Sequence, residues 1–438
     1  MTPAEVEAEL LRRWPESQLD PSQDRIRDLL GLLGDPHTAY PVILVAGTNG
    51  KTSTARMIEA LVRAAGLRTG LFTSPHLERV AERIVVDGEA LDDDAFAAAY
   101  DDLAPYLGIV DARHDHPLSF FEVLTAMAYA TFADAPVDVA VVEVGMGGTW
   151  DATNLVDAQV AVVTPVGLDH QAYLGDPLTA IAGEKAGIIK SGALAIVAQQ
   201  PLEAAEVLLR RCAAVGATVA REGLEFGVVT RAVAVGGQLL SLKGLGGEYD
   251  EVFLTLLGAH QAHNAAVALA AAEGLLGGGA EQLDADLVRT AFAGVRSPGR
   301  LEVVRRSPTV LVDAAHNPAG ATVLAEAVVD SFTFDRLVGV VGVLSDKDAR
   351  GILDALEPVL SEVVITRPPS PRAMDPDALA ALAVAVFGED RVVVAPGVAD
   401  AVAEAVALAE DDATLGGSGV LVAGSVVLAG EVRRLLRG

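Results

Sequence analysis

The stretch "VILVAGTNGKTSTAR", residues Val42–Arg56, joins an apolar run, a glycine-bracketed loop and the start of a helical pattern. The apolar run is typical of a buried strand. The usual phosphate-binding loop reads G-x-x-x-x-G-K-[ST]. Counting back from Gly50-Lys51-Thr52 puts its first glycine at position 45, where this chain has Val45. Gly47 begins a shorter loop instead, G-T-N-G-K-T.

The short loop still meets the physical needs of a phosphate cradle. Gly47 and Gly50 permit positive φ angles and a close approach of the backbone to a ligand. Successive N–H groups at a helix N-terminus attract an anion, Lys51 adds a cation, and Thr52 offers a hydroxyl for Mg²⁺. The loop therefore predicts an enzyme that binds ATP or GTP. The alternative is a glycine-rich turn that simply opens a helix.

Composition limits the class of protein. The chain has 438 residues, 51% of them hydrophobic and only 4% aromatic, which favours two or three domains with aliphatic α/β cores. Its formal net charge of -28 argues against nucleic acid as a partner. Long apolar runs and a leader-like N-terminus are missing, and Cys212 is the only cysteine. We therefore expect a cytoplasmic monomer without a membrane partner or an internal disulfide.

The order of apolar and amphipathic segments predicts the fold class, α/β. From Pro41 to about residue 200, short β-branched runs alternate with helical patterns, which indicates a mostly parallel sheet covered on both faces. Residues 226–257 predict a small antiparallel hairpin around a Gly-Gly turn, and helices are expected at 262–276 and 284–294. After Ser297-Pro298-Gly299 a second βα series begins. We predict a P-loop ATPase-like domain over 1–297, a Rossmann-like α/β domain over 298–438, and a cleft between them.

Two polar residues stand at predicted strand ends, where ligands gather in open α/β sheets. Glu143 comes late in the apolar run "VDVAVVEVG". An unpaired buried carboxylate is costly, and a Mg²⁺ beside a nucleotide would satisfy it. The alternative is a structural carboxylate. Ser74, in "FTSPHL", is either a ligand of the same site or a turn residue.

Two further segments carry unusual residues. "VVTPVGLDH" delivers Asp169 and His170 after a strand, although an isolated histidine is most often structural. "AGEKAGIIK" contains Lys185, one of only five lysines in the chain. Lys185 either pairs with an acid such as Glu184 or, as a neutral amine, takes up CO₂ to form a carbamate that bridges a cation.

Together these segments resemble the Mur ligase superfamily, and within it the folylpolyglutamate synthase/dihydrofolate synthase family. The resemblance runs from about Asp35 to the C-terminus, and the shortened phosphate loop agrees with it. It implies an ATP-binding Mur-ligase-type central domain over 1–297 and a glutamate-ligase domain over 298–438. It is carried by the order and spacing of "GTNGKTS", "TSPHL", "ERIVVDG", "FFEVLTAMAY", "VEVGMGGTWDATN", "GLDHQAYLG", "IAGEKAGIIK", "GAHQAHNAAVA", "SPGRLE", "VDAAHNPAG", "LSDKD" and "GSVVLAGEVR".

The resemblance also implies roles for individual residues. One Mg²⁺ would be held by Thr52, Ser74 and Glu143, and a second by His170 and carbamylated Lys185. The implied catalytic residues are Lys51, His170, Lys185 and His316. The implied ATP-binding residues are Gly47, Thr48, Asn49, Gly50, Lys51, Thr52 and Ser53 around the phosphates, Asn264 at the adenine, Arg300 at the phosphates, and Asp313 at the ribose or an interdomain contact.

The two organic substrates are implied in the same way. The amino substrate would meet His316, Asp346 and Lys347. The pterin side would be lined by Phe120, Phe121, Asp151 and Ala152. The sequence departs from the family at two places. The charged residues of "TSPHLERVAERI" differ from the more polar or aromatic loop that relatives often have, so the resemblance does not define the details of this folate-side loop. Trp150 stands where a smaller or aliphatic residue is common.

The reaction implied is amide formation between a folate-type carboxylate (dihydropteroate, a reduced folate or a folyl-glutamate) and L-glutamate. ATP would activate the carboxylate as an acyl phosphate, a step that depends mainly on positioning and charge neutralisation. One alternative is another Mur-family ligase acting on a UDP-muramoyl peptide, for which the chain before Gly47 is expected to be too short. The other is a regulatory P-loop protein that binds nucleotide.

Overall fold

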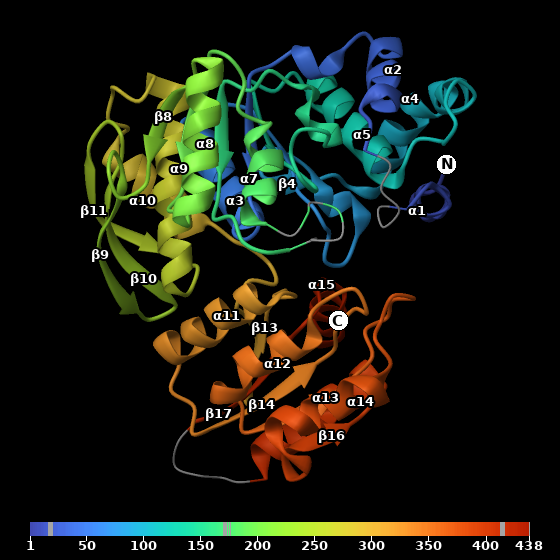
Figure 1. Cartoon of the computed structure of the whole chain (residues 1–438), viewed down its shortest axis with the longest axis vertical. Coiled ribbons are helices and arrows are strands. Elements are labelled where there is room, and N and C mark those ends of the chain that lie inside the picture. Colours follow the sequence, from blue (N-terminus) through green and yellow to red (C-terminus); the bar gives the residue numbers. More distant parts are fainter. Residues whose placement is uncertain (16–20, 170–172, 174, 176, 412–416, 438) are drawn as a thin grey trace. The chain divides into compact units, whose positions relative to one another are not determined.

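The computed structural model describes residues 1–15, 21–169, 173, 175, 177–411 and 417–437 (Figure 1). The chain divides into two compact units. Unit 1 comprises Met1–Ala232, Leu239–Thr255 and Ala262–Val295. Unit 2 comprises Val233–Gln238, Leu256–Gln261 and Arg296–Gly438. In the described part of the chain, no helix combines the length and the apolar character that crossing a membrane requires.

Unit 1 is built on an eight-stranded sheet in the order β4-β3-β2-β5-β1-β6-β7-β8. The neighbours from β2 to β8 pair in parallel, and β3 and β4 extend the sheet antiparallel. The predicted mostly parallel sheet is thus confirmed. Its strands are β1 (Val42–Ala46), β2 (Thr69–Phe72), β3 (Ile84–Val86), β4 (Glu89–Ala90), β5 (Val139–Glu143), β6 (Val160–Val163), β7 (Leu194–Val197) and β8 (Thr218–Arg221).

Strand β1 lies at the centre of this sheet because it is apolar along its whole length. All five of its residues are buried, and Leu44 is in register with Val142 of β5 on one side and Ala161 of β6 on the other. A strand buried on both faces needs such a continuous run. The described helices of unit 1 include α1 (Pro3–Leu11), α2 (Asp24–Leu32), α3 (Lys51–Ala64), α4 (Asp93–Asp111), α5 (Phe120–Asp134), α7 (Leu178–Ala186), α8 (Leu202–Val215) and α10 (Ala285–Gly294).

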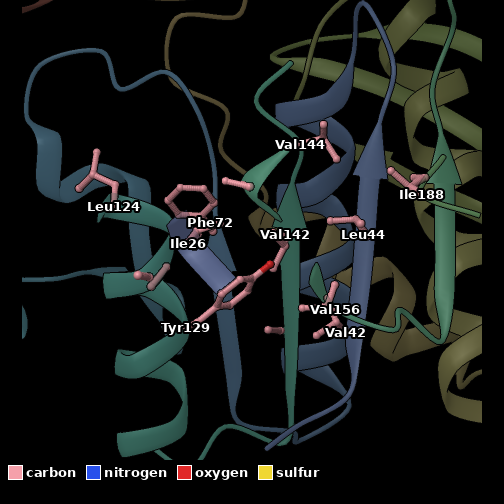
Figure 2. Close-up of a cluster of buried hydrophobic side chains, with 14 of the residues drawn as sticks. Ile26, Val42, Leu44, Phe72, Leu124, Tyr129, Val142, Val144, Val156 and Ile188 are labelled. Atoms are coloured by element: carbon pink, nitrogen blue, oxygen red, sulfur yellow. The ribbon is translucent and has the colours of Figure 1, made fainter. Parts of the chain in front are cut away.

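The main core lies between this sheet and the N-terminal helices. Figure 2 shows Phe72, Leu124 and Tyr129 gathered beside the strand that carries Val142. The Tyr129 hydroxyl is buried there and donates to the carbonyl of Thr153 at 2.6 Å. Because the bond satisfies the hydroxyl, this aromatic ring is accommodated in the aliphatic core.

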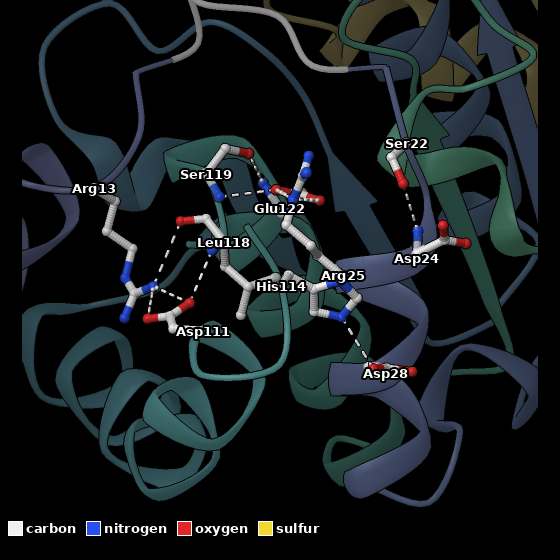
Figure 3. A network of polar contacts seen from close by, with 10 residues as sticks. All are labelled: Arg13, Ser22, Asp24, Arg25, Asp28, Asp111, His114, Leu118, Ser119 and Glu122. Atoms are coloured by element: carbon white, nitrogen blue, oxygen red, sulfur yellow. Dashed lines mark hydrogen bonds and ion pairs between the residues drawn. The ribbon is translucent and has the colours of Figure 1, made fainter. Parts of the chain in front are cut away.

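A polar layer holds the start of α5 (Figure 3). Ser119 and Glu122 form a capping box, in which each accepts a bond from the other's backbone N–H (3.2 and 2.8 Å). The Nε of Arg25 in α2 lies 3.2 Å from both carboxylate oxygens of Glu122, and both side chains are buried. His114 lies 3.0 Å from Asp28 at the edge of this layer. The N-terminus of α5 is therefore fixed both by its cap and by a buried ion pair.

A three-stranded sheet, in the order β11-β10-β9, follows β8 along the chain. β9 (Gly227–Ala234) and β10 (Gly237–Lys243) are joined by only two residues, and Gly236 has φ +77°. Two residues can join only antiparallel strands, so the predicted hairpin is present, with the turn one residue before the predicted Gly-Gly pair. β11 (Glu248–Leu254) completes the sheet, and α9 (Ala259–Gly277) and α10 cover the two predicted helical stretches.

Unit 2 has a six-stranded sheet in the order β12-β13-β17-β14-β15-β16. Only β12 pairs antiparallel, with β13, so the predicted Rossmann-like α/β architecture is confirmed. The strands are β12 (Glu302–Arg306), β13 (Thr309–Val312), β14 (Arg336–Val341), β15 (Glu362–Ile365), β16 (Val392–Val394) and β17 (Ser418–Ala423). The helices are α11 (Pro318–Ser331), α12 (Ala349–Leu356), α13 (Pro376–Phe387), α14 (Val398–Glu410) and α15 (Val426–Arg437).

Candidate nucleotide and acceptor site

The glycine-bracketed loop lies where β1 ends and α3 begins. Gly47 has φ +149° and Gly50 has φ +86°, which side-chain-bearing residues rarely adopt. A Cβ on Gly47 would stand 1.8 Å from the Thr164 hydroxyl oxygen, and one on Gly50 would stand 2.6 Å from Asn264 Oδ1. Both glycines are therefore required by conformation and by packing. Asn264, in α9, is buried against the loop.

The loop carbonyls accept hydrogen bonds from two lysines. Lys51 Nζ donates to the carbonyl oxygens of Gly47 at 3.2 Å and Thr48 at 3.1 Å. Lys185 Nζ donates to the same Gly47 oxygen at 2.7 Å. The backbone N–H of Thr48 donates to Pro165 O, and its hydroxyl exchanges bonds with the N–H and carbonyl of Gly167, all at 3.0 Å. The loop is thus held by two lysines and by the segment Pro165–Gly167, and it leads directly into the N-terminus of α3.

Glu143 ends β5 beside this loop, because the register pairs it with Val45 of β1. It is 1% exposed. One carboxylate oxygen accepts from the Thr52 hydroxyl at 3.0 Å and the other from the Ser74 backbone N–H at 3.2 Å. The structure thus brings Thr52, Ser74 and Glu143 together, as the sequence predicts. Carboxylate and hydroxyl oxygens are ligands that suit Mg²⁺.

Histidine, cysteine and acidic side chains are the usual source of further metal ligands. Within the described ranges these side chains form no group of three that could hold a metal ion. A cation at Glu143 would therefore depend on hydroxyl and phosphate oxygens as well. The predicted ligand His170 lies outside the described residues, so its position is not part of this geometry.

Lys185 is buried at the end of α7, 5% exposed. Burial, and then the nearby charge of Lys51, lowers the pKa of Lys185 to about 7, although Asp169, Asp151 and Glu184 act in the opposite direction. A substantial share of this amine is therefore neutral at neutral pH. Glu184 Oε2 is itself buried without a hydrogen-bond partner. The nitrogen of Lys185, in its neutral form a nucleophile, therefore lies next to the phosphate loop.

The position of Lys185 depends on close packing of α7 against the loop after β5. A Cβ on Gly148 would stand 2.3 Å from the Glu184 carbonyl oxygen. The backbone N–H of Thr149 donates to that same oxygen at 3.0 Å. The glycine is thus needed for the last turn of α7 to approach.

The residues predicted for the pterin side come from α5 and this same loop. Phe121 is half-buried, and a Cβ on Gly145 would stand 2.5 Å from its ring. Asp151, 3% exposed, accepts from the N–H groups of Met146 at 2.8 Å and Thr153 at 2.9 Å, and burial raises the pKa of its carboxyl group. Phe120 and Ala152 are also buried. Asp151 therefore shapes its own loop, and Phe121 is the most accessible member of the four.

Three residues near these segments were not singled out from the sequence. Arg83 is 2% exposed, its Nε donates to His76 Nδ1 at 3.0 Å, and its guanidinium lies 5.0 Å from the Phe120 ring centre. Burial, and then the charge of Arg83, lowers the pKa of His76 to about 3, which keeps it a neutral acceptor. Gln23 Nε2 donates to the Asp151 carbonyl at 2.8 Å. Arg83 and His76 stand in quoted motifs, but the sequence carries no sign of their burial.

Unit 2 places Arg300 in a tight turn. Gly299 has φ +66° and Leu301 has φ +45°. Asp313 supports the turn by accepting from the N–H groups of Leu301 and Ala315, each at 2.7 Å. Burial raises the pKa of Asp313, while Arg300 partly offsets this. The carboxylate of Asp313 therefore holds the backbone around Arg300.

The remaining predicted residues of unit 2 lie on loops that follow strands. His316 Nδ1 donates to the Ala314 carbonyl at 2.9 Å just after β13. Asp346 forms an ion pair with Arg372 at 2.7 Å after β14, and Lys347 adjoins it. These loops stand at the carboxyl ends of β13 and β14, the usual ligand edge of a parallel sheet.

Comparisons with known proteins match both units. Residues 119–272 match the Mur ligase middle domain, and residues 299–426 match the Mur ligase, glutamate ligase domain. The chain is 51% identical to dihydrofolate synthase/folylpolyglutamate synthase of Mycobacterium tuberculosis, over 98% of this chain and 93% of that protein. It is 34% identical to folylpolyglutamate synthase of Lacticaseibacillus casei, over 94% of each.

Solved structures show the same similarity. Mycobacterium tuberculosis folylpolyglutamate synthase complexed with ADP superposes with a TM-score of 0.96 at 51% identity, covering 99% of this chain and 98% of that one. Escherichia coli FolC in complex with DHPP and ADP gives 0.85 at 31% identity, covering 100% and 98%.

Proposed function

This chain belongs to the Mur ligase family, among the dihydrofolate synthase/folylpolyglutamate synthases, and from that premise we propose that it joins L-glutamate to a folate-type carboxylate using ATP. The observation that carries the proposal is that Lys185 bonds to Gly47 at the start of the glycine loop and Glu143 bonds to Thr52 directly after its end. A regulatory nucleotide-binding protein needs no such set.

We propose that the enzyme works as a cytoplasmic monomer.

The nucleotide phosphates would lie on the loop and the N-terminus of α3, from Gly47 to Ser53. The exposed end of this helix favours negative charge. Lys51 would exchange its bonds to the Gly47 and Thr48 carbonyls for bonds to the β- and γ-phosphate oxygens. Asn264, packed against Gly50, is the proposed adenine contact. Arg300 and Asp313 are the proposed nucleotide-binding residues of the glutamate-ligase domain, residues 298–438.

The residues at Glu143 fit a magnesium ion. Glu143 is a buried carboxylate whose neighbours are a hydroxyl and a backbone N–H, so a cation would compensate its charge. Thr52, Ser74 and Glu143 would hold this ion. A bound Mg²⁺ would neutralise charge on the transferred phosphoryl group. His170 and Lys185 would hold a second ion.

Carbamylation of Lys185 would supply the anionic ligand for that second site. The neutral amine nitrogen adds to CO₂, releases one proton, and leaves a carbamate carrying one negative charge. The lowered pKa of Lys185 favours this reaction because only the unprotonated amine adds to CO₂. The carbamate would also place a negative charge near the positive charge of Lys51, and opposite charges in proximity favour each other's charged form.

The reaction would proceed in two steps. An oxygen of the acceptor carboxylate attacks the γ-phosphorus in line, the bond to the β-phosphate oxygen breaks, and ADP leaves. The neutral amine of L-glutamate then attacks the acyl phosphate carbonyl, the C–O bond to the phosphate breaks, and inorganic phosphate leaves with its bonding electrons while the nitrogen gives up one proton, which the departing phosphate can take. Lys51 and Arg300 would stabilise charge on the phosphate oxygens. His316, Asp346 and Lys347 are the proposed contacts of the amino substrate, with His316 in a catalytic role.

The acceptor side would use Phe121 as its aromatic face, supported by Phe120, Asp151 and Ala152. Arg83 lies over the Phe120 ring and is fixed by His76, so it would keep the start of α5 in place. Asp151 and Ala152 belong to the loop that also carries Gly148 and Thr149 against α7. One loop therefore connects the acceptor side to Lys185.

Product analysis tests the function. Purified protein is incubated with ATP, Mg²⁺ and L-glutamate, together with either dihydropteroate or tetrahydrofolate, and products are identified by mass spectrometry. We expect glutamyl addition to at least one acceptor, with one phosphate released per amide formed. A UDP-muramoyl peptide acceptor should give no product. Lys51→Ala should abolish turnover, and amide formation by that variant at the wild-type rate would refute the proposed phosphate site.

A further inference from the structure

Thr164 is a fully buried residue directly after β6 that takes no part in the proposed chemistry. Its hydroxyl oxygen lies 2.8 Å from the Asn49 carbonyl oxygen and 3.3 Å from that of Ala46. A Cβ on Gly47 would stand only 1.8 Å from the same hydroxyl. Thr164 thus lies in contact with the phosphate loop along most of its length.

The carbonyl oxygens of Gly47, Thr48 and Asn49 in this loop each accept a hydrogen bond from a side chain. Lys185 and Lys51 donate to Gly47, and Lys51 also donates to Thr48. The Thr164 hydroxyl donates to Asn49 at the shorter of its two distances. Both lysines have proposed roles, toward phosphate and CO₂, so their bonds to the loop would change during the reaction. The Thr164 hydroxyl is a neutral donor and need not change.

The bond to Asn49 determines the direction of one amide group. In a trans peptide the carbonyl oxygen and the following N–H point in opposite directions. Because the Asn49 oxygen is bonded to Thr164, the N–H of Gly50 points away from Thr164. A nest for an anion requires its N–H groups to face the ligand and its carbonyls to face away. Gly50, with φ +86°, is the residue at which the chain turns into α3.

We propose that Thr164 is a positioning residue for nucleotide binding, which fixes the Asn49–Gly50 peptide so that the Gly50 N–H faces the phosphates. The inference rests on the proposed nucleotide site, and it adds a residue that acts through the loop without contacting the nucleotide. The competing explanation is that the hydroxyl only stabilises the fold. The two explanations differ, because a purely structural bond affects unfolding without selectively affecting nucleotide affinity.

Three variants separate these explanations. Thr164→Val keeps the shape and removes the hydroxyl, and Thr164→Ser keeps the hydroxyl. Thr366→Val is the matched control, because Thr366 is also fully buried and its hydroxyl donates to a strand-end carbonyl, that of Pro396, at 3.3 Å in unit 2. The dissociation constant of Mg-ADP is measured by calorimetry, and the KM values for ATP and L-glutamate by the amide-forming assay.

Thr164→Val should weaken Mg-ADP binding and raise the KM for ATP by about tenfold or more, because the Asn49–Gly50 peptide loses the bond that fixes its direction and nucleotide binding must then reorient it. The KM for L-glutamate should stay within about twofold, as expected when only one binding step is affected. Thr164→Ser and Thr366→Val should bind Mg-ADP within about threefold of wild type, since both keep the bond to Asn49. A folded Thr164→Val protein with wild-type affinity would overturn the proposal.

A measurement on the wild-type chain keeps the proposal testable if Thr164→Val does not fold. Asn49–Gly50 is the only Asn-Gly pair in the sequence, so labelling with ¹³C-carbonyl asparagine and ¹⁵N-glycine yields one amide signal. Adding Mg-ADP should shift this Gly50 signal strongly. An unchanged signal in a sample that binds Mg-ADP would overturn the inference, whereas a wild-type protein that binds no Mg-ADP would overturn the nucleotide site itself.

Discussion

Lys185 Nζ donates a hydrogen bond of 2.7 Å to the carbonyl oxygen of Gly47, a residue 138 positions earlier in the chain. The bond joins the end of α7 to the phosphate loop in the interior of unit 1. Lys185 therefore lies beside the proposed phosphate and metal sites, and we expect its charge state to affect both ligand binding and stability.

The first prediction concerns the carbamate. Lys185→Ala should reduce turnover to nearly zero, because the variant lacks the nitrogen that would carry the ligand. Small carboxylates such as acetate or formate should restore part of the activity by filling the space and supplying an anionic oxygen. The assay is amide formation at increasing carboxylate concentration. Wild-type protein, which already has its side chain in place, is the control and should not be activated.

The second prediction concerns stability and pH. The pKa of Lys185 is lowered to about 7 from its ordinary 10.5. Between these values the unfolded chain binds a proton that the native chain does not, so stability rises with pH, by about 1.4 kcal/mol per unit for one group. Below pH 7 both states are protonated and this slope disappears. Lys185→Met should remove this pH-dependent destabilisation, because methionine carries no titratable group.

Urea unfolding in CO₂-free buffer at pH 6 to 9 measures this effect. Both tryptophans, Trp14 and Trp150, lie in unit 1, so their fluorescence reports on the unit that contains Lys185. The stability advantage of Lys185→Met over wild type should be largest at pH 6, change little up to about pH 7, and shrink as the pH rises further. An advantage that is constant across this range would contradict the assigned pKa.

The third prediction concerns the metal site. Glu143→Gln keeps the size of the side chain but removes the charge and one of its two acceptor oxygens, so the variant can accept only one of the Thr52 and Ser74 bonds. We expect kcat to fall by about a hundredfold or more, as when one charge-stabilising group is removed, and the Mg²⁺ concentration for half-maximal activity to rise. The matched control is Glu203→Gln, an exposed glutamate in the first turn of α8. Equal Mg²⁺ dependence in Glu143→Gln and wild type would argue against this ligand.

The fourth prediction concerns the buried ion pair beneath α5. Arg25→Met leaves the Glu122 carboxylate buried without its cation and should lower the free energy of unfolding by about 3–5 kcal/mol. Replacing both partners, as Arg25→Met with Glu122→Gln, should recover much of this loss. The control is Arg12→Met, whose partner Glu9 is exposed, with an expected change below about 1 kcal/mol. Equal losses in Arg25→Met and Arg12→Met would contradict the structure.

Local pattern was enough to predict the strands, the phosphate loop and the approach of Glu143 to Thr52. The apolar runs of β1 and β5 are continuous, and parallel strands bring their carboxyl ends to one edge, so loop and carboxylate must meet there. The same reasoning predicted both α/β units, since strands and helices alternate on each side of Ser297–Gly299.

The roles of Thr164, Arg83 and Asp151 could not be predicted because they depend on contacts between distant segments. Thr164 lies 115 residues from Asn49, whose carbonyl it binds. Arg83 is a charged residue buried against Phe120, which periodicity alone would place at the surface. Asp151 resembles a ligand in sequence, yet its oxygens bind its own loop. In each case the role of the residue follows from its contacts in the folded chain, which residue type alone does not reveal.

The strand order has a consequence for synthesis of the chain. β1 emerges early from the ribosome, but its partners β5 and β6 come about a hundred residues later. A nascent chain that ends before β6 lacks one neighbour of β1 and also lacks Thr164 and Lys185. Long-range pairing of this kind delays folding. We therefore expect that translation must pass α9, which carries Asn264, before unit 1 has all of its proposed nucleotide contacts.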